Sequence, residues 1–202
     1  MPGNYDRKDH LYRKAKQEGY RSRAAYKLIE LDHRYKLIRQ RMSVVDLGCY
    51  PGGWLQVVLE RIGQQGLLVG VDLNYVEPVS VKGKEAAIIK GDIFSEETRA
   101  EILSRAGGKV SLVLSDLSPQ LSGVRFRDAV KSAELVECAL DLSREILENG
   151  GSLVAKIFPG PECDSLVEKF RASFRVFSRA SLKSSRKSST ELYFVAREFR
   201  GC

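Results

Sequence analysis

The sequence predicts an α/β protein, a mostly parallel sheet covered by helices on both faces with a β-hairpin at its end. From residue 43 onward, short apolar runs alternate with longer amphipathic stretches, as expected of strand–helix–strand units. The first apolar run ends on an acid and breaks into a glycine-rich turn. The 202 residues allow one domain with a full core and fall short of two ordinary domains. We therefore predict a single domain over residues 1–202.

The predicted elements follow one another without an internal repeat. A helix is expected within residues 21–38, with Ser22 as its N-cap and an apolar face made of Ala24, Leu28, Leu31 and Tyr35. Later helices are expected over residues 54–63, 95–108, 128–151 and 163–174. Strands are expected over residues 43–47, 67–73, 86–92, 110–116, 152–158, 175–180 and 191–199.

The turn after the first strand reads VVDLGCYPGGW, residues 44–54. Ligands of open α/β sheets bind outside the carboxyl ends of the strands, so this turn is a candidate binding loop. Its three glycines, Gly48, Gly52 and Gly53, permit backbone angles and close approaches that a Cβ would forbid. The helix that follows starts with free N–H groups. The Lys-Ser/Thr pair of a P-loop is missing and the spacing is not GxGxxG, so a nucleoside triphosphate is not expected.

Acids close the first three predicted strands: Asp46, Asp72 and Asp92. A carboxylate at the tip of the second strand can accept both ribose hydroxyls, and one on the third can accept an exocyclic amine. Singly, such acids are more often N-caps or turn residues. Taken in order, they describe a ligand with an amino-acid end, a ribose and an adenine, which is S-adenosylmethionine. Trp54 is either a core residue or a border of the cofactor site.

Positive charge is concentrated in two segments. Residues 1–41 hold 12 Lys or Arg against 5 Asp or Glu, whereas residues 42–202 hold 21 of each. Residues 169–190 contain several basic residues and no acid. The two segments indicate a polyanionic partner, most simply nucleic acid, although solvated surface charge would give the same composition. Residues 1–20 are expected to form a basic, flexible arm.

Seven blocks of the sequence resemble, in the same order, the FtsJ-type ribose 2′-O-methyltransferases. They are RSRAAYKL, VVDLGCYPGGW, GVDL, GDIF, VLSDLSP, GGSLVAKIF and SSTELYFVA, within residues 20–197. The resemblance implies a Rossmann-like sheet of seven strands in the order 3-2-1-4-5-7-6, with the last strand antiparallel. It also implies methyl transfer from S-adenosylmethionine, and its blocks are most similar to enzymes that act on a uridine of large-subunit (23S) ribosomal RNA.

The family's catalytic Lys, Asp, Lys and Glu match Lys27, Asp116, Lys156 and Glu191. A ribose hydroxyl is a poor nucleophile, so methyl transfer needs a base and an in-line geometry. Lys156 follows the apolar run SLVA, where a lysine needs a partner. We expect it to be the general base, with Lys27 as the nearby cation and Asp116 orienting its amine; the division of roles between Lys27 and Glu191 stays open. An ordinary buried ion pair of Lys156 with Asp116 is the alternative.

The expected ligand contacts follow from these matches. The cofactor set comprises Asp46, Gly48, Pro51, Gly52, Gly53, Trp54, Asp72, Asp92 and Asp116. The expected RNA contacts, which lie in the two basic segments just before Lys27 and Glu191, are Lys14, Lys16, Arg21, Arg23, Arg186 and Lys187. The partner is expected to be ribosomal RNA or the large ribosomal subunit.

Two positions depart from the family pattern: Tyr50 stands in the glycine loop and Gln120 in the block SPQLSG. They leave open a methyltransferase acting on another RNA, such as tRNA or an mRNA cap. A catalytically idle RNA-binding or ribosome-assembly factor on the same fold is a further alternative. An NAD-dependent dehydrogenase is disfavoured by the glycine spacing.

Further features of the sequence bear on the expected location, oligomeric state and cysteine chemistry. No apolar run approaches the ~20 residues of a membrane span, and the polar N-terminus lacks an export signal. We expect a monomer in the cytoplasm. The four cysteines at 49, 138, 163 and 202 are too scattered for a disulfide framework or a CxxC zinc pair, so reduced thiols and no structural metal are expected.

Overall fold

The computed structural model describes residues 9–186 and 189–201. Its helices are α1 (His10–Gln17), α2 (Ala25–Tyr35), α3 (Gly53–Ile62), α4 (Glu96–Ala106), α5 (Arg125–Ile146) and α6 (Cys163–Ser173). Its strands are β1 (Ser43–Leu47), β2 (Leu67–Asp72), β3 (Ser80–Val81), β4 (Lys84–Glu85), β5 (Ala87–Lys90), β6 (Val110–Ser115), β7 (Leu147–Ile157), β8 (Phe174–Ala180) and β9 (Leu192–Phe199).

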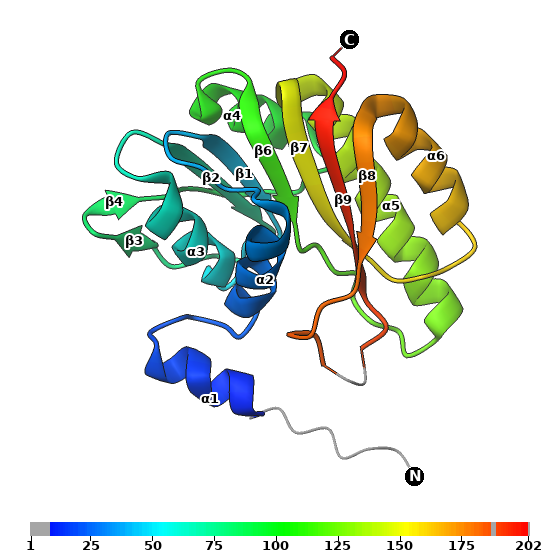
Figure 1. The fold of residues 1–202 in the computed structure, drawn as a ribbon, viewed down its shortest axis with the longest axis horizontal. Coiled ribbons are helices and arrows are strands. Elements are labelled where there is room, and N and C mark those ends of the chain that lie inside the picture. Colours follow the sequence, from blue (N-terminus) through cyan, green and yellow to red (C-terminus); the bar gives the residue numbers. More distant parts are fainter. Residues whose placement is uncertain (1–8, 187–188, 202) are drawn as a thin grey trace.

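Seven of these strands form one twisted sheet in the order β5-β2-β1-β6-β7-β9-β8 (Figure 1). Numbered as the seven predicted strands, this is the expected order 3-2-1-4-5-7-6, which is confirmed. The pairs from β5 to β7 are parallel, and β9 runs antiparallel to both β7 and β8. The carboxyl ends of β1, β2, β5, β6 and β7 therefore meet at one edge of the sheet.

Helices cover both faces of the sheet, and each face has its own apolar cluster. One cluster joins the sheet to α4, α5 and α6, with Ile102, Leu140 and Phe170 at its centre. The other joins it to α2 and α3, with Leu28 and Leu55 fully buried. The central strands are apolar on both sides, as expected of parallel strands between two helical layers. No helix within the described ranges is long and apolar enough to cross a lipid bilayer.

The structure corrects several sequence-based boundaries. Within the predicted arm, residues 10–17 form α1 with Asp9 as its N-cap. Ser22 does not cap α2: the helix begins at Ala25 and its N-cap is Ala24, without a side-chain cap. The fifth predicted strand begins at Leu147 rather than residue 152, since the helix before it ends at Ile146. The small hairpin of β3 and β4 was not predicted.

Candidate active site

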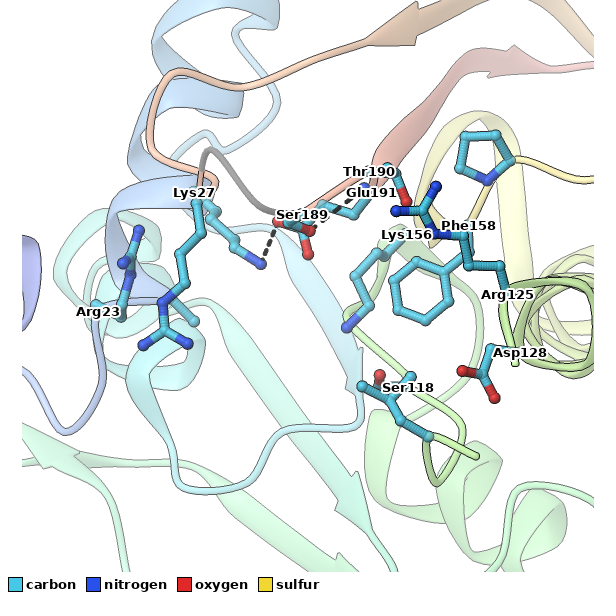
Figure 2. Close-up of a pocket in the computed structure, with 14 residues that line it drawn as sticks. Arg23, Lys27, Ser118, Arg125, Asp128, Lys156, Phe158, Ser189, Thr190 and Glu191 are labelled. Carbon is cyan, nitrogen blue, oxygen red and sulfur yellow. Dashed lines mark hydrogen bonds and ion pairs between the residues drawn. The ribbon is translucent and has the colours of Figure 1, made fainter. Parts of the chain in front are cut away.

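A pocket of about 750 Å³ opens where the carboxyl ends of β6 and β7 meet α2 and the β8–β9 connection. Its wall includes Arg23 and Lys27 from the N-terminal region, Lys156 from β7, and Arg186 and Glu191 from the β8–β9 connection. Figure 2 shows Lys27 and Lys156 reaching this space from different elements. Three segments far apart in the sequence therefore supply these charged groups to one cavity.

Lys156 and Asp116 form a buried ion pair. Lys156 Nζ lies 3.1 Å from Asp116 Oδ1 and donates a hydrogen bond to the main-chain oxygen of Asp116 at 2.7 Å. Tyr193 Oη donates to the same carboxylate oxygen at 2.8 Å. Burial alone would raise the pKa of Asp116, but the charges of Lys156 and Lys27 and these hydrogen bonds outweigh it and hold the pKa below its usual value. Asp116 is thus held as a carboxylate.

Lys27 and Glu191 form a second pair beside the first. Lys27 Nζ lies 2.6 Å from Glu191 Oε1 (Figure 2), and Ser185 Oγ donates to the same oxygen at 2.5 Å. Burial would raise the pKa of Glu191, but Lys27 and Ser185 lower it below its usual value. Glu191 lies just before β9 rather than inside it. The four predicted catalytic side chains are therefore assembled at one place, in two ion pairs.

The acids predicted to hold the cofactor lie on the β1, β2 and β5 side of Asp116, outside the wall of the pocket. Asp46 is completely buried, and neither of its carboxylate oxygens has a hydrogen-bond partner among the described residues. Burial, and then the negative charges of Asp116 and Asp72, raise the pKa of Asp46 well above its usual value. An uncompensated buried carboxylate of this kind fits a cationic ligand.

The other two strand-tip acids organise their own turns. Asp72 Oδ2 accepts from the backbone N–H of Tyr50 at 2.9 Å, and its Oδ1 accepts from the backbone N–H of Asn74 at 2.8 Å. Asp72 thereby fixes the glycine loop to the end of β2. Asp92 is exposed in the turn after β5 and accepts from the backbone N–H of Phe94 at 3.0 Å.

The glycine loop is shaped by the protein's own packing. Gly48 has a φ of +77°, and a Cβ there would lie 3.0 Å from the backbone N of Leu117. Gly52 has a φ of +111° and is the N-cap of α3, where a Cβ would meet Val79 and Arg21. A Cβ on Gly53 would lie 2.4 Å from Ser22 Oγ. The loop needs glycine because three neighbouring segments pack closely against it.

The remaining loop residues divide between core and surface. Trp54 is buried, and its indole N–H donates to the main-chain oxygen of Ala24 at 2.8 Å, which makes it a packing residue. Pro51 contributes its main-chain oxygen as an acceptor for Arg21. The Tyr50 side chain is 57% exposed, so it does not fill the sheet edge. Gln120 is exposed on the segment after β6.

The basic residues predicted to contact RNA occupy different surroundings. Lys14 pairs with Glu18, and Lys16 lies over the Tyr12 ring. Arg21 donates to the main-chain oxygens of Glu77 and Pro78 and so ties the glycine loop to the segment after β2. Arg23 and Arg186 both line the pocket. Lys187 lies outside the described residues.

Sequence reasoning missed Tyr193, the hydroxyl donor to Asp116. A signal was available, because Tyr193 lies two positions after Glu191 and in an extended chain both side chains point to the same side. The β7–β9 register places Tyr193 opposite Lys156. Reasoning also missed Asp9, which contacts Arg23 and Arg186. No local pattern could find a contact made across 177 positions.

The strand order and the acids at the strand tips define a Rossmann-like α/β protein of the methyltransferase class. Residues 20–199 match the FtsJ-like methyltransferases, and the chain belongs to this family.

Named relatives are similar over nearly the whole chain. "Ribosomal RNA large subunit methyltransferase E" of Methanothermobacter thermautotrophicus is 42% identical, over 96% of this chain and 92% of its own. The protein of the same name from Hahella chejuensis is 41% identical, over 98% and 95%. A Plasmodium falciparum structure assigned as a ribosomal RNA methyltransferase superposes with a TM-score of 0.80 at 28% identity, over 91% of this chain and 100% of its own.

Proposed function

We propose that this protein transfers a methyl group from S-adenosylmethionine to a ribose 2′-hydroxyl of ribosomal RNA, and that the target is a uridine of the large subunit. The observation that carries the proposal is that Lys27, Lys156 and Glu191 line one pocket, with Lys27 paired to Glu191 and Lys156 paired to Asp116. The relatives named as ribosomal RNA methyltransferases support the substrate class. The basic residues around the pocket support a polyanion.

The family implies S-adenosylmethionine, and the residues at the strand tips fit it. This cofactor supplies a methyl group on a sulfonium, whose positive charge makes the transfer possible. Asp46 offers two buried carboxylate oxygens without partners among the described residues, which fits a positively charged group. Asp72, at the tip of β2, is the proposed acceptor for ribose hydroxyls. Asp116 directly follows β6, the strand between β1 and β7, and so lies between this set and the pocket.

The pocket side supplies the groups that handle the proton. In the proposed step the ribose 2′-hydroxyl would give its proton to an unprotonated Lys156 amine, while its oxygen accepts the methyl group that bound S-adenosylmethionine would supply. Asp116 and its main-chain oxygen aim that amine. Lys27 places a second positive charge near Asp116, and Glu191 holds Lys27 in position. General-base catalysis of this kind is worth about 10²- to 10⁴-fold in rate.

The test is methylation with a labelled methyl donor. Naked ribosomal RNA and large subunits are incubated with the protein and methyl-labelled S-adenosylmethionine, and the modified nucleotide is mapped. Label on a uridine ribose of the large-subunit RNA supports the proposal. Label on tRNA or cap analogues alone, or on a base, contradicts it. No label on any RNA despite cofactor binding would favour an idle binding factor.

A Lys156→Ala variant tests the assigned base. We expect methyl transfer to fall by about 10²- to 10⁴-fold while S-adenosylmethionine still binds, measured by isothermal titration. Lys109→Ala is a matched control, because Lys109 precedes β6 at the opposite edge of the sheet and donates to the main-chain oxygen of Glu145. An active Lys156→Ala protein would rule out Lys156 as the base.

A further inference from the structure

Asp9 holds together two arginines of the pocket wall. Its Oδ1 accepts the backbone N–H of Tyr12 at 3.0 Å and so caps α1. Its Oδ2 forms an ion pair with Arg23 and lies 3.3 Å from Arg186 Nε. One carboxylate therefore both starts α1 and links the segment before α2 to the β8–β9 connection.

The two arginines form an anion site that Asp9 occupies. Arg23 is largely buried, with a side-chain exposure of 15%, and its second guanidinium nitrogen donates to the main-chain oxygen of Ser184 at 2.6 Å. Burial, and then the charge of Arg186, lower the pKa of Arg23. Two cations held this close need an anion between them. Guanidinium groups bind carboxylates and phosphates in the same geometry.

The same two arginines line the pocket that contains Lys27, Lys156 and Glu191. An RNA strand that presents a ribose to Lys156 also brings its phosphates, which are spaced along the strand on either side of that ribose. A phosphate near the pocket would meet Arg23 and Arg186 as its nearest paired donors. Asp9 already contacts those donors.

We propose that Asp9 competes with an RNA phosphate for Arg23 and Arg186, so that RNA binding displaces Asp9 and releases α1. The inference rests on the proposed function, since it takes the pocket to be the site of RNA. Asp9 would then weaken RNA binding by an intramolecular contact, and it would favour an RNA that brings a phosphate to this position.

The buried contact area of α1 is small enough to allow its displacement. Figure 1 shows α1 beside the body of the protein, beyond α2 and away from the sheet. Ala15 is the single buried residue among those of α1. Lys14 of α1 also lies over the ring of Tyr26. Releasing α1 would therefore expose little apolar area.

The first test is RNA affinity of an Asp9→Asn variant. Binding of a short fluorescein-labelled oligouridylate is measured by anisotropy, without a methyl donor. We expect Asp9→Asn to bind about fivefold more tightly than the unmodified protein, because the arginines no longer have to leave an internal anion. Glu148→Gln removes the same charge at the start of β7, at the other end of that strand from Lys156, and should change affinity by less than about twofold.

A double-mutant cycle separates competition from a general charge effect. In an Arg186→Gln background, Asp9→Asn should give much less than its full gain, because the paired site is already broken. A gain that persists there, or one that Glu148→Gln matches, would overturn the inference.

A second measurement needs no variant. Hydrogen exchange of the full chain is recorded with and without the oligouridylate, and we expect the amides of residues 10–17 to exchange faster when it is bound. Slower exchange of α1 would show that Asp9 stays in place and would overturn the inference. If neither the unmodified protein nor any variant binds the oligouridylate, the proposed function is overturned as well. Equal binding by Asp9→Asn and the unmodified protein would overturn only the proposed competition.

Discussion

Asp46 offers the sharpest test of the cofactor side, because its carboxylate is buried without a hydrogen-bond partner among the described residues. Replacing it by asparagine keeps the shape of the side chain and removes the charge. The unmodified protein tolerates this carboxylate at a cost in stability, which is the pattern expected of a group retained for binding. Asp46→Asn should therefore stabilise the free protein and weaken cofactor binding.

The magnitude follows from linkage. Burial and the charges of Asp116 and Asp72 raise the pKa of Asp46, so its contribution to stability is fully present below about pH 4 and is lost as the pH rises toward the folded-state pKa. Each pH unit costs about 1.4 kcal/mol, so the loss at pH 7 cannot exceed about 4 kcal/mol. An amide also needs partners, so we expect Asp46→Asn to recover about half of that limit.

Thermal unfolding followed by circular dichroism measures this difference. At pH 7 the variant should unfold about 4–8 °C higher than the unmodified protein, and the gap should shrink steadily toward pH 5. Titration with S-adenosylmethionine at pH 8 should show binding weakened at least about tenfold. The reasoning is refuted if Asp46→Asn unfolds at a lower temperature at pH 8, or if the difference does not depend on pH.

Two further variants test the support of the site. Tyr193→Phe removes the hydroxyl donor 2.8 Å from Asp116 Oδ1, while Asp116 keeps its contact with Lys156. Calorimetry should show a loss in unfolding free energy of about 1.5 kcal/mol, or roughly 3–6 °C in the unfolding temperature. Methyl transfer should slow while cofactor affinity is unchanged, and unchanged stability would contradict the assignment. Glu30 accepts hydrogen bonds from the backbone N–H groups of Lys183 and Ser184. Burial would raise the pKa of Glu30, but these hydrogen bonds outweigh it and lower the pKa below its usual value. The stabilisation from Glu30 is therefore present above about pH 4 and is lost as the pH falls through the folded-state pKa. Glu30→Gln should cost about 1 kcal/mol in urea unfolding at pH 7 and less at pH 3.5, and a difference independent of pH would exclude this role.

Much of the architecture can be predicted from the sequence because strands and turns are marked by residues close together in the chain. The apolar runs that end at Leu47 and Asp72 and the glycine at 48 mark strand, exit and turn without reference to the rest of the chain. The strand order came from resemblance and is confirmed. The ends of elements were less accurate: the helix before β7 stops at Ile146, and neither Gly150 nor Gly151 ends it. Glycine patterns favour an end, but tertiary packing fixes its position.

The sequence-based view of the arm and the glycine loop was incomplete for a different reason. Arg21 was predicted to contact RNA, and in the structure its guanidinium donates to main-chain oxygens of the loop and of the segment after β2. Whether it also contacts RNA stays a prediction. Basic residues near each other in sequence can serve either an external anion or an internal carbonyl, and only the position of the neighbouring chain distinguishes the two.

The sequence by itself determined the alternation of strands and helices, the carboxylates at the strand tips and the types of residue that could carry the chemistry, because periodicity and turn formation depend on neighbours in the chain. Only the tertiary structure decided which charges meet: Lys27 with Glu191, Lys156 with Asp116 and Tyr193, and Asp9 with Arg23 and Arg186. The physical reason is that burial and ion pairing are properties of the folded chain, set by distances of a few ångströms between segments that the sequence keeps far apart.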